Sequence, residues 1–544
     1  MASRLLRYSP LGACAIGSLL LGAAYPGQPL AMLGSVALAA LSAVGVYDLV
    51  QTHHSIQRNY PILAHLRFLF ETIRPEIRQY FLESNTEAQP FSRNQRSLVY
   101  QRAKGQLDKT PFGTQQDVYA DGHEWMNHSM SPAKVDHSGF RVEIGKDKPG
   151  VLKPYSSSVL NISAMSFGSL SANAILALNN GAKAGGFAHD TGEGSISRYH
   201  REGGGDLIWE IGSGYFGCRN EDGSFSEELF IKNAAPDQVK MIEIKLSQGA
   251  KPGHGGILPG PKVTIEIASA RGVRPGQDCI SPAAHSAFST PEELLRFVAR
   301  LRDLSGGKPT GFKLCIGHPW EFFAIAKAMA STGITPDFIV IDGSEGGTGA
   351  APVEFTDHVG SPLAEGLRLA HNTLVGLNLR HLVKIGASGK IVSSFDMARA
   401  IANGADWCNS ARGFMFALGC IQSLSCHTDR CPTGVATQDP TRQEALVVPD
   451  KSARVASFHR ATVAALAELV AAAGLAHPSQ ITPDHIMRRG SDGRAVPMSE
   501  AALYIKPGSL ETGAPQDEPF RRYWALSSPS SFSLSPAVIL APQS

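Results

Sequence analysis

The chain has 544 residues, of which 43% are hydrophobic and 18% charged, and its net charge at neutral pH is +2. This balance is typical of a folded protein with a buried core and excludes global disorder. Lysine and arginine (50 residues) nearly cancel aspartate and glutamate (48), so the charge predicts no nucleic-acid partner. Five of the eight cysteines are scattered without paired spacing, which favours a reducing compartment over secretion.

The N-terminal region contains a long apolar stretch. Residues 8–47 carry no charge, and "PGQP" at residues 26–29 interrupts the run. Since one helical crossing of a bilayer needs ~20 apolar residues, the stretch predicts a transmembrane hairpin of two helices. Arginines flank it on both sides, so we expect both ends, and the catalytic domain, on the cytoplasmic side of the inner membrane. The alternative is a signal peptide with Arg4 and Arg7 as its basic region.

The regions on either side of the central part of the chain have their own patterns. Periodicity in "ILAHLRFLFETI" and "PEIRQYFLE" predicts amphipathic helices near the membrane or packed on the main domain. The serine- and proline-rich C-terminus is typical of a flexible tail. The predicted divisions are a two-helix membrane anchor, a helical lead-in, a catalytic domain, a helical extension and a tail, at residues 1–50, 51–150, 151–440, 441–515 and 516–544.

Short apolar runs rich in β-branched residues recur through the central part, each followed by Gly, Ser or Asp. Five helical stretches, such as "TPEELLRFVARLRDL" and "SFDMARAIANGA", lie between them. Eight strands and five helices in ~250 residues predict a (β/α)8 TIM-type barrel, with an open doubly wound sheet as the alternative. The second and third strands have the weakest signals. The runs are at residues 158–166, 185–191, 207–212, 241–247, 311–316, 338–343, 382–388 and 407–412.

A barrel predicts chemistry where strands end, with a phosphate held after strands seven and eight. Those positions hold "GASGK" at residues 386–390 and "NSARG" at residues 409–413. Their glycines permit close backbone approach, and Lys390 and Arg412 supply positive charge. We therefore expect a phosphate there.

One G-x-G-x-x-G motif occurs, "GSGYFG" at residues 212–217. A dinucleotide site needs a helix directly after this motif and an acidic residue ~20 positions later. The polar turn "CRNEDGSFSEE" follows instead. We expect no dinucleotide at this position.

Polar residues at other strand ends suit a small acid. "EIKLSQGAKPGHGG" places Lys245, Gln248 and Lys251 in a glycine-rich loop, where two ammonium groups and an amide suit a dicarboxylate; a solvated surface loop is the alternative. In "HDTGEGS", Glu193 stands between two glycines, a position suited to proton transfer or to holding an amine. "IDGSEGGTGAAP" offers backbone that can lie against a flat ring. The last two motifs also fit ordinary turns.

Three cysteines lie close together in "GCIQSLSCHTDRCPTG", at Cys420, Cys426 and Cys431. Thiolates are the usual ligands of iron–sulfur clusters, and a loop of this length can wrap one. Zinc fits less well, because a structural zinc site takes four ligands and only His427 is available as a fourth. A single reactive thiol, or ordinary structural cysteines, are the remaining alternatives.

Long motifs then occur in a familiar order: "AMSFGSLSANA", "TGEG", "KLSQGAKPGHGGILPGPKV", "ISPAAH", "DGSEGGTGAAP" and "GCIQSLSCHTDRCPTGVATQDP". Over residues 159–440 the chain resembles the synthase domain of glutamate synthase. The resemblance implies a barrel that binds FMN and a 3Fe-4S cluster. It also implies that L-glutamate is made from 2-oxoglutarate and ammonia through 2-iminoglutarate.

By matching position, the resemblance implies three sets of site residues. The cluster ligands are Cys420, Cys426 and Cys431. The substrate-facing residues are Glu193, Lys245, Gln248 and Lys251, of which Glu193 and Lys245 are expected to be catalytic. The FMN-site residues are Ser166, Gly168, Thr191, Lys313, Gly346, Gly347, Gly389, Lys390 and Arg412.

The chain also departs from that family. Glutamate synthases carry a glutaminase domain whose nucleophilic cysteine begins the mature protein, whereas this chain begins Met-Ala-Ser. We therefore expect no glutamine hydrolysis by that route, and ammonia that is free or comes from a separate subunit. Electrons are expected from a separate donor protein. Two alternatives remain: an FMN and iron–sulfur enzyme acting on another imino or keto acid, and a non-catalytic electron-transfer module docked at the membrane.

Overall fold

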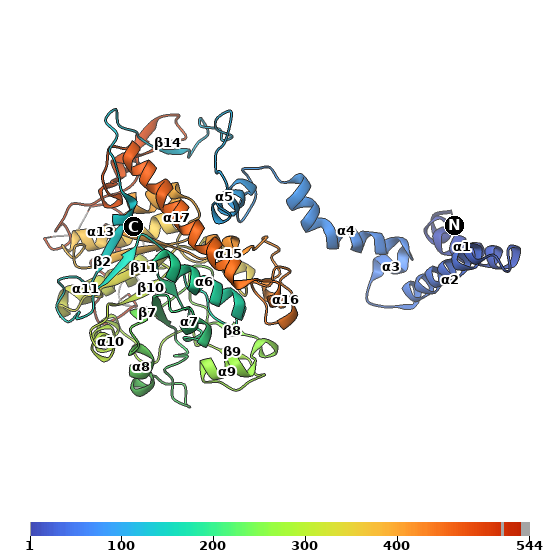
Figure 1. Ribbon diagram of the computed structural model, residues 1–544, viewed down its shortest axis with the longest axis horizontal. Helices are drawn as coiled ribbons and strands as arrows, with labels where there is room; N and C mark the ends of the chain where they lie inside the picture. Colours follow the sequence, from blue (N-terminus) through green and yellow to red (C-terminus); the bar gives the residue numbers. More distant parts are fainter. Residues whose placement is uncertain (1, 513–515, 535–544) are drawn as a thin grey trace, which may run out of the picture. The chain divides into compact units, whose positions relative to one another are not determined.

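The computed structural model describes residues 2–512 and 516–534, and the chain divides into two compact units, Met1–Arg93 and Asn94–Ser544. The described part of the first unit is helical (Figure 1). Its amphipathic segment ends in a short π-helical turn, Arg78–Leu82. The helices are α1 (Ala2–Ala24), α2 (Pro29–Val50), α3 (Ser55–Asn59) and α4 (Leu63–Ile77).

Two helices, α1 and α2, form where the membrane hairpin was predicted, and the turn between them lies at the Pro/Gly break. The hydroxyls of Ser18 and Ser35 each donate to the other's backbone carbonyl at 2.8 Å, which joins α1 to α2. By length and hydropathy, the described chain has two helices able to cross a bilayer, α2 and α17 (Val448–Ala472). Nearly half of the α17 window is buried in the second unit, whereas α2 is mostly exposed. The membrane crossing stays a prediction.

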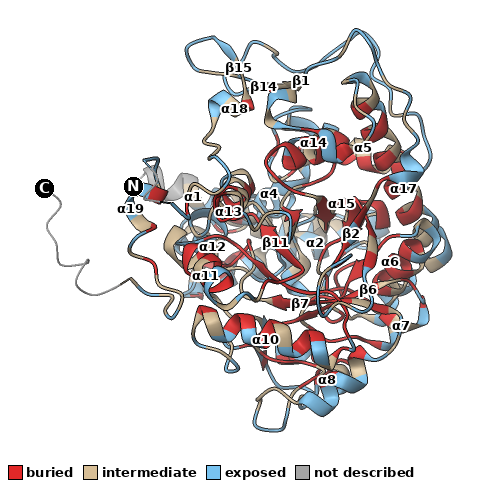
Figure 2. Cartoon of the chain, turned by 90° about the vertical axis from the view of Figure 1, so that its left-hand side faces the viewer, coloured by how far each residue is buried: buried red, intermediate tan, exposed pale blue. Residues whose placement is uncertain are grey.

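The second unit contains a closed barrel of eight parallel strands, as predicted, and its strands are buried (Figure 2). Pairing of β13 with β4 closes the barrel, which rules out the open sheet. All eight expected strands form, including the short second one. In order around the barrel they are β4 (Leu160–Ile162), β5 (His189–Asp190), β6 (Leu207–Ile211), β7 (Val239–Lys245), β10 (Thr310–Leu314), β11 (Phe338–Asp342), β12 (Lys384–Ser388) and β13 (Trp407–Ser410).

The five predicted helices form between these strands. Helix α10 shows why: Thr290 caps its N-terminus in a capping box with Glu293, Pro291 occupies the first turn, and Leu294 and Val298 are fully buried. The five are α6 (Ala172–Gly185), α10 (Pro291–Leu304), α11 (Pro319–Thr332), α13 (Leu363–Gly376) and α14 (Ser394–Ala402). The other helices between β5 and the cysteine loop are α7 (Arg198–Glu202), α8 (Glu227–Ala234), α9 (Ile265–Arg271), α12 (Val353–His358) and α15 (Arg412–Leu418).

Both flanking regions contain strands as well as the predicted helices. β1 (Glu124–Met126) pairs with β14 (Ile486–Arg489), which also pairs with β15 (Ala495–Pro497). Short strands of this kind carry too little alternation to stand out in the sequence. The remaining elements are α5 (Arg93–Ala103), β2 (Arg141–Ile144), β3 (Tyr155–Ser158), β8 (Ile257–Leu258), β9 (Cys279–Ile280), α16 (Pro440–Glu444) and α18 (Met498–Ala501).

The prediction of a flexible tail over residues 516–544 is wrong for its described part. Helix α19 (Phe520–Tyr523) packs on the barrel, and the Phe520 ring stacks on Phe323 of α11 at a centroid distance of 5.0 Å. Trp524 meets the same ring edge-on and is 8% exposed. Burial of these aromatic rings outweighs the polar composition around them. Residues 535–544 lie outside the described residues.

Candidate active site

The polar residues predicted after β5 and β7 meet at the carboxyl end of the barrel. Lys245, the last residue of β7, places its ammonium 3.0 Å from Oε1 of Glu193. Glycines make room for this carboxylate, because a Cβ on Gly212 or Gly256 would lie 2.6 or 2.7 Å from a Glu193 oxygen. Ser281 also donates toward Glu193 Oε2 at 3.5 Å. Gly212 and Gly256, which are distant from Glu193 in the sequence, therefore leave the space that its carboxylate occupies.

Gln248 and Lys251 complete the predicted group. The Lys245 ammonium donates to Oε1 of Gln248 at 3.2 Å, and the Lys251 ammonium donates to the carbonyl of Gly255 at 3.4 Å. Lys251 is 5% exposed, so it is not a surface lysine of a solvated loop. The structure thus brings all four predicted substrate-facing residues together.

The charge on Glu193 follows from its neighbours. Burial alone raises the pKa of this carboxyl, but the ammonium of Lys245, with Lys251 and Arg271 nearby, outweighs burial and lowers the pKa to about 2. Glu193 is therefore an ionised hydrogen-bond acceptor at neutral pH. Burial, followed by the charge of Lys245, lowers the pKa of Lys251 and is only partly opposed by Glu193. An added carboxylate would relieve this excess of positive charge.

Three residues at this site were not predicted. Arg271 donates from Nη2 to the carbonyl of Phe167 at 3.2 Å, and Ser281 faces Glu193. Nε2 of His285 lies 2.9 Å from the Lys245 carbonyl, while its Nδ1 lies 3.1 Å from the Tyr215 hydroxyl. Ser281 and His285 both belong to "ISPAAH", a motif that carried the resemblance but received no residue roles. Arg271 lies in a short helix with no motif to identify it.

The predicted ring-binding residues after β4 and β5 lie beside this group. The Ser166 hydroxyl is 3.5 Å from Arg271 Nη2, and Gly168 has a left-handed backbone with φ of 104°. The Thr191 hydroxyl accepts from the backbone N–H of Glu210 at 3.1 Å and donates to the carbonyl of Gly192. Thr191 therefore supports the strand ends and has its hydroxyl already engaged.

The predicted phosphate loops also converge. Nη2 of Arg412 donates to the carbonyl of Glu345 at 2.6 Å, and a Cβ on Gly347 would lie 3.0 Å from Arg412 Nη1. Burial lowers the pKa of Arg412 to about 10; burial, then the charge of Arg412, lowers the pKa of Lys390. Two partly buried cations beside glycine backbone form a site suited to an anion such as a phosphate.

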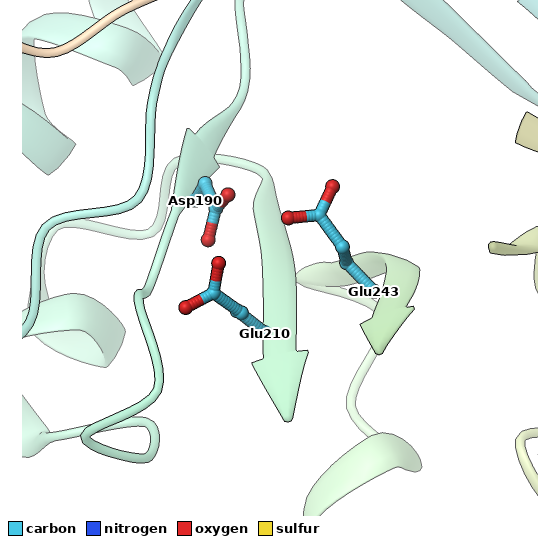
Figure 3. Close-up of side chains that lie close together, drawn as sticks. All are labelled: Asp190, Glu210 and Glu243. Carbon is cyan, nitrogen blue, oxygen red and sulfur yellow. The ribbon is translucent and has the colours of Figure 1, made fainter. Parts of the chain in front are cut away.

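Lys313 lies deeper than expected for a residue at the rim. It belongs to β10, and its ammonium forms ion pairs with Glu210 of β6 and Glu243 of β7. Asp190 and these two glutamates turn toward one another between the strands (Figure 3). Glu210 is a charged residue within the apolar strand "LIWEIG", which is itself a sequence signal for a buried polar site, although no role was predicted for it.

The three cysteines of the predicted cluster share one loop held by distant residues. The Tyr100 hydroxyl donates to the Cys420 carbonyl at 2.7 Å, and the Lys262 ammonium donates to the Cys426 carbonyl at 3.1 Å. Burial raises the pKa of the Cys420 thiol to about 12. For Cys431, burial is outweighed by the Thr433 hydroxyl and by backbone N–H groups, which lower its pKa. Side chains from distant parts of the sequence thus hold the backbone of this loop.

Backbone conformation singles out the same loop. Gln422, Leu424 and Asp429 all have φ near 60°, which is unfavourable for residues with a Cβ and typical of functional sites. The loop abuts the glycine cluster after β11, because a Cβ on Gly349 would lie 3.1 Å from Cys426 Cβ. Cys426 therefore adjoins the backbone that was predicted to face a flat ring.

A family model described as the conserved region in glutamate synthase matches residues 143–476. The glutamate synthase large subunit-like protein YerD of Bacillus subtilis is 38% identical over 505 residues, which cover 86% of this chain and 96% of that protein. The archaeal glutamate synthase (NADPH) of Methanocaldococcus jannaschii is 38% identical over 315 residues, 58% of each chain.

Among solved structures, a mutant flavocytochrome b2 with pyruvate bound aligns with a TM-score of 0.41 and 10% identity. That alignment covers 82% of this chain and 90% of the other.

Proposed function

This chain belongs to the glutamate synthase family of oxidoreductases, and from that premise we propose that it makes L-glutamate by reductive amination of 2-oxoglutarate. The observation that carries the proposal is the grouping of Glu193, Lys245, Gln248 and Lys251 at the barrel mouth. Two ammonium groups suit the two carboxylates of the substrate, and an ionised carboxylate suits the incoming nitrogen.

The chemistry balances with these residues in place. Condensation of 2-oxoglutarate with ammonia forms a C=N bond and releases water, and 2-iminoglutarate then gains a hydride and a proton. Lys245 and Lys251 bind the carboxylates and orient the reacting carbon. Glu193 accepts hydrogen bonds from the nitrogen and takes its proton during condensation. FMN supplies the hydride when it is bound.

We propose that FMN binds across the mouth. Lys390 and Arg412 hold its phosphate, bordered by Gly346, Gly347 and Gly389. The lowered pKa values of the two cations support this assignment, because a bound phosphate would compensate their buried charge. Ser166, Gly168 and Thr191 are assigned to the ring on the strength of the resemblance. Lys313, which the resemblance also places there, forms ion pairs with Glu210 and Glu243 in the barrel interior.

We further propose that Cys420, Cys426 and Cys431 hold a 3Fe-4S cluster that receives electrons from a separate donor protein. Support comes from the partly buried thiols of Cys420 and Cys426, because a bound metal would stabilise their thiolates and lower the pKa values that burial raises. The nearby ammonium of Lys262 and backbone N–H groups at Cys431 favour negative charge on the sulfurs.

The proposal is tested by purifying the full chain without oxygen and recording absorption and electron paramagnetic resonance spectra. The flavin is then reduced and mixed with 2-oxoglutarate plus ammonium, with either compound alone, or with pyruvate plus ammonium. We expect reoxidation and stoichiometric glutamate only with the first mixture. A preparation lacking both flavin and iron refutes the proposal. A reduced flavin that responds equally to the pyruvate mixture points to another keto acid.

We also propose that residues 1–50 anchor the protein in the inner membrane, with the catalytic domain in the cytoplasm. Exposed apolar side chains on α2 support this proposal, including Leu30, Leu33 and Val36. The two hydrogen bonds between Ser18 and Ser35, which join the helices, support it as well. The test is alkaline carbonate extraction of membranes, followed by N-terminal sequencing. Recovery in the soluble fraction, or a mature N-terminus after the first apolar stretch, contradicts the anchor.

A further inference from the structure

Three carboxyl side chains meet inside the barrel below the proposed substrate site. Asp190, Glu210 and Glu243 come from the neighbouring strands β5, β6 and β7, and each has an oxygen within 4.8 Å of an oxygen of the other two (Figure 3). Each residue is at most 1% exposed. Glu210 and Glu243 are direct partners in the parallel register of β6 and β7. We call these three residues the carboxyl cluster.

The cluster has more acidic groups than cations. In the described chain, the ion pairs to these carboxyls all come from Lys313 of β10, which contacts Glu210 closely and Glu243 at 3.4 Å. The negative charge of Asp342 of β11 also acts on Lys313, and this carboxylate accepts from the backbone N–H of Gly249. Three ionised carboxylates would therefore leave two uncompensated negative charges in the core.

Hydrogen bonding does not relieve this excess. Oδ2 of Asp190 and both oxygens of Glu243 have no hydrogen-bond partner among the described residues. The other Asp190 oxygen accepts from the backbone N–H of Gly192 at 3.0 Å. A buried carboxylate without partners is costly, and such a group neutralises by taking a proton. The unpartnered oxygens turn toward one another, so a proton on one carboxyl has an acceptor on the next.

We propose that the carboxyl cluster is a proton-storage site, in which Glu243 is a neutral carboxylic acid that shares its proton with Asp190, while Glu210 is the ionised partner of Lys313. A metal ion is not needed to explain the cluster, because the Lys313 ammonium already contacts two of its carboxyls. This assignment depends on the burial and charge of the three carboxyl groups and not on the identity of the substrate.

The electrostatics of the individual groups agree with this assignment. Burial raises the pKa of Glu243 well above its usual value. Burial, followed by the negative charge of Glu210, raises the pKa of Asp190 to about 7. The carboxylates raise the pKa of Lys313, despite its burial. Both shifts favour a protonated Glu243–Asp190 pair over a fully ionised cluster.

A proton store at this position can supply protons to the reaction, and this role rests on the proposed function. Formation of one glutamate from 2-oxoglutarate and ammonium consumes two electrons and two protons and releases one water. On β7, Glu243 lies two residues before Lys245 and so faces the same side of the strand. Glu193 follows Asp190 by three residues. The stored protons thus lie directly below the groups that bind substrate.

The test is infrared spectroscopy of the full chain in its cofactor-loaded form. We record wild type, Glu243→Gln and Asp190→Asn at several pH values and in deuterated water. Subtracting the variant spectrum from the wild-type spectrum removes the carbonyl bands of the flavin, which both proteins contain. We expect the carbonyl stretch of a protonated carboxylic acid at neutral pH, shifted by deuterium and lost in Glu243→Gln. A wild type without such a band at neutral pH, or a band unchanged in both variants, overturns the proposal.

Stability gives a second readout that is independent of the proposed function. Glutamine is a close match for a protonated glutamate, so Glu243→Gln should fold with an almost unchanged unfolding midpoint. Glu210→Gln removes the ionised partner of Lys313 and should lower that midpoint clearly. The reverse order, or failure of Glu243→Gln to fold while Glu210→Gln does, overturns the assignment. Loss of glutamate formation alone bears on the proposed function and leaves the store intact.

Discussion

Lys245 at the end of β7 and Glu193 beyond the end of β5 form an ion pair of 3.0 Å at the mouth of the barrel. The pair is only partly exposed, at 12% and 18% of the two side chains. Lys245 also donates to Gln248, so its ammonium is oriented before any substrate arrives. A substrate carboxylate that binds Lys245 would share it with Glu193, which leaves Glu193 available to hold an amine.

Replacing Glu193 by glutamine should abolish most of the reaction while leaving the fold intact. The amide keeps the shape but cannot take a proton, so we expect kcat to fall by about 10²–10⁴-fold. The KM for 2-oxoglutarate should change far less, because the lysines that bind its carboxylates remain. Steady-state assays with varied 2-oxoglutarate and ammonium measure both. Full turnover by this variant would remove Glu193 from the mechanism.

Acid stability should depend on the same carboxyl. Its pKa is about 2 in the folded protein and about 4.3 in an unfolded chain, so the folded state binds fewer protons between these values. The stabilisation is therefore complete above about pH 5 and is lost as pH falls toward about 2, on the order of 2–3 kcal/mol in total. Urea unfolding from pH 7 to pH 3 should show a steeper decline for wild type than for Glu193→Gln. Parallel curves would contradict the depressed pKa.

Lys251 should act mainly in binding the dicarboxylate. Hydrogen bonds to charged groups contribute about 1.5–3 kcal/mol, so Lys251→Ala should raise the KM for 2-oxoglutarate by about tenfold or more. The matched control is Lys240→Ala, which changes a lysine near the start of β7, at the opposite end of the barrel from Lys251, where it is paired with Asp237. That control should behave as wild type. Equal effects from both substitutions would mean a general loss of stability.

Arg412 should recognise the phosphate of FMN. We expect Arg412→Ala to weaken FMN binding by about tenfold or more, because a charge-assisted contact is lost, and to leave riboflavin binding almost unchanged. Flavin fluorescence titration of the apoprotein with each ligand measures the two affinities. The control is Lys384→Ala, which changes the first residue of β12, at the end of that strand away from the phosphate loops. An equal loss for riboflavin would place Arg412 away from the phosphate.

The predictions made from sequence agree best with the structure for residues in short motifs at strand ends. The phosphate loops were predicted because strand ends in a barrel share one face. The four substrate-facing residues were assigned through the resemblance, because their spacing alone also fits a solvated loop. Arg271 was missed, because it reaches the site from an insertion between β7 and β10 whose path no periodicity reveals. Lys313 was expected at the flavin ring, and only the barrel interior shows its ion pairs with Glu210 and Glu243.

The eight strands, the five long helices and their order could be predicted from the sequence alone, because they depend on hydrogen bonding and burial within short windows. Which side chains meet in space follows from the tertiary structure. The carboxyl cluster, the Glu193–Lys245 pair and the packing of Trp524 on α11 all join residues far apart in the chain. The closure and stagger of the barrel set those meetings, and no local pattern records them.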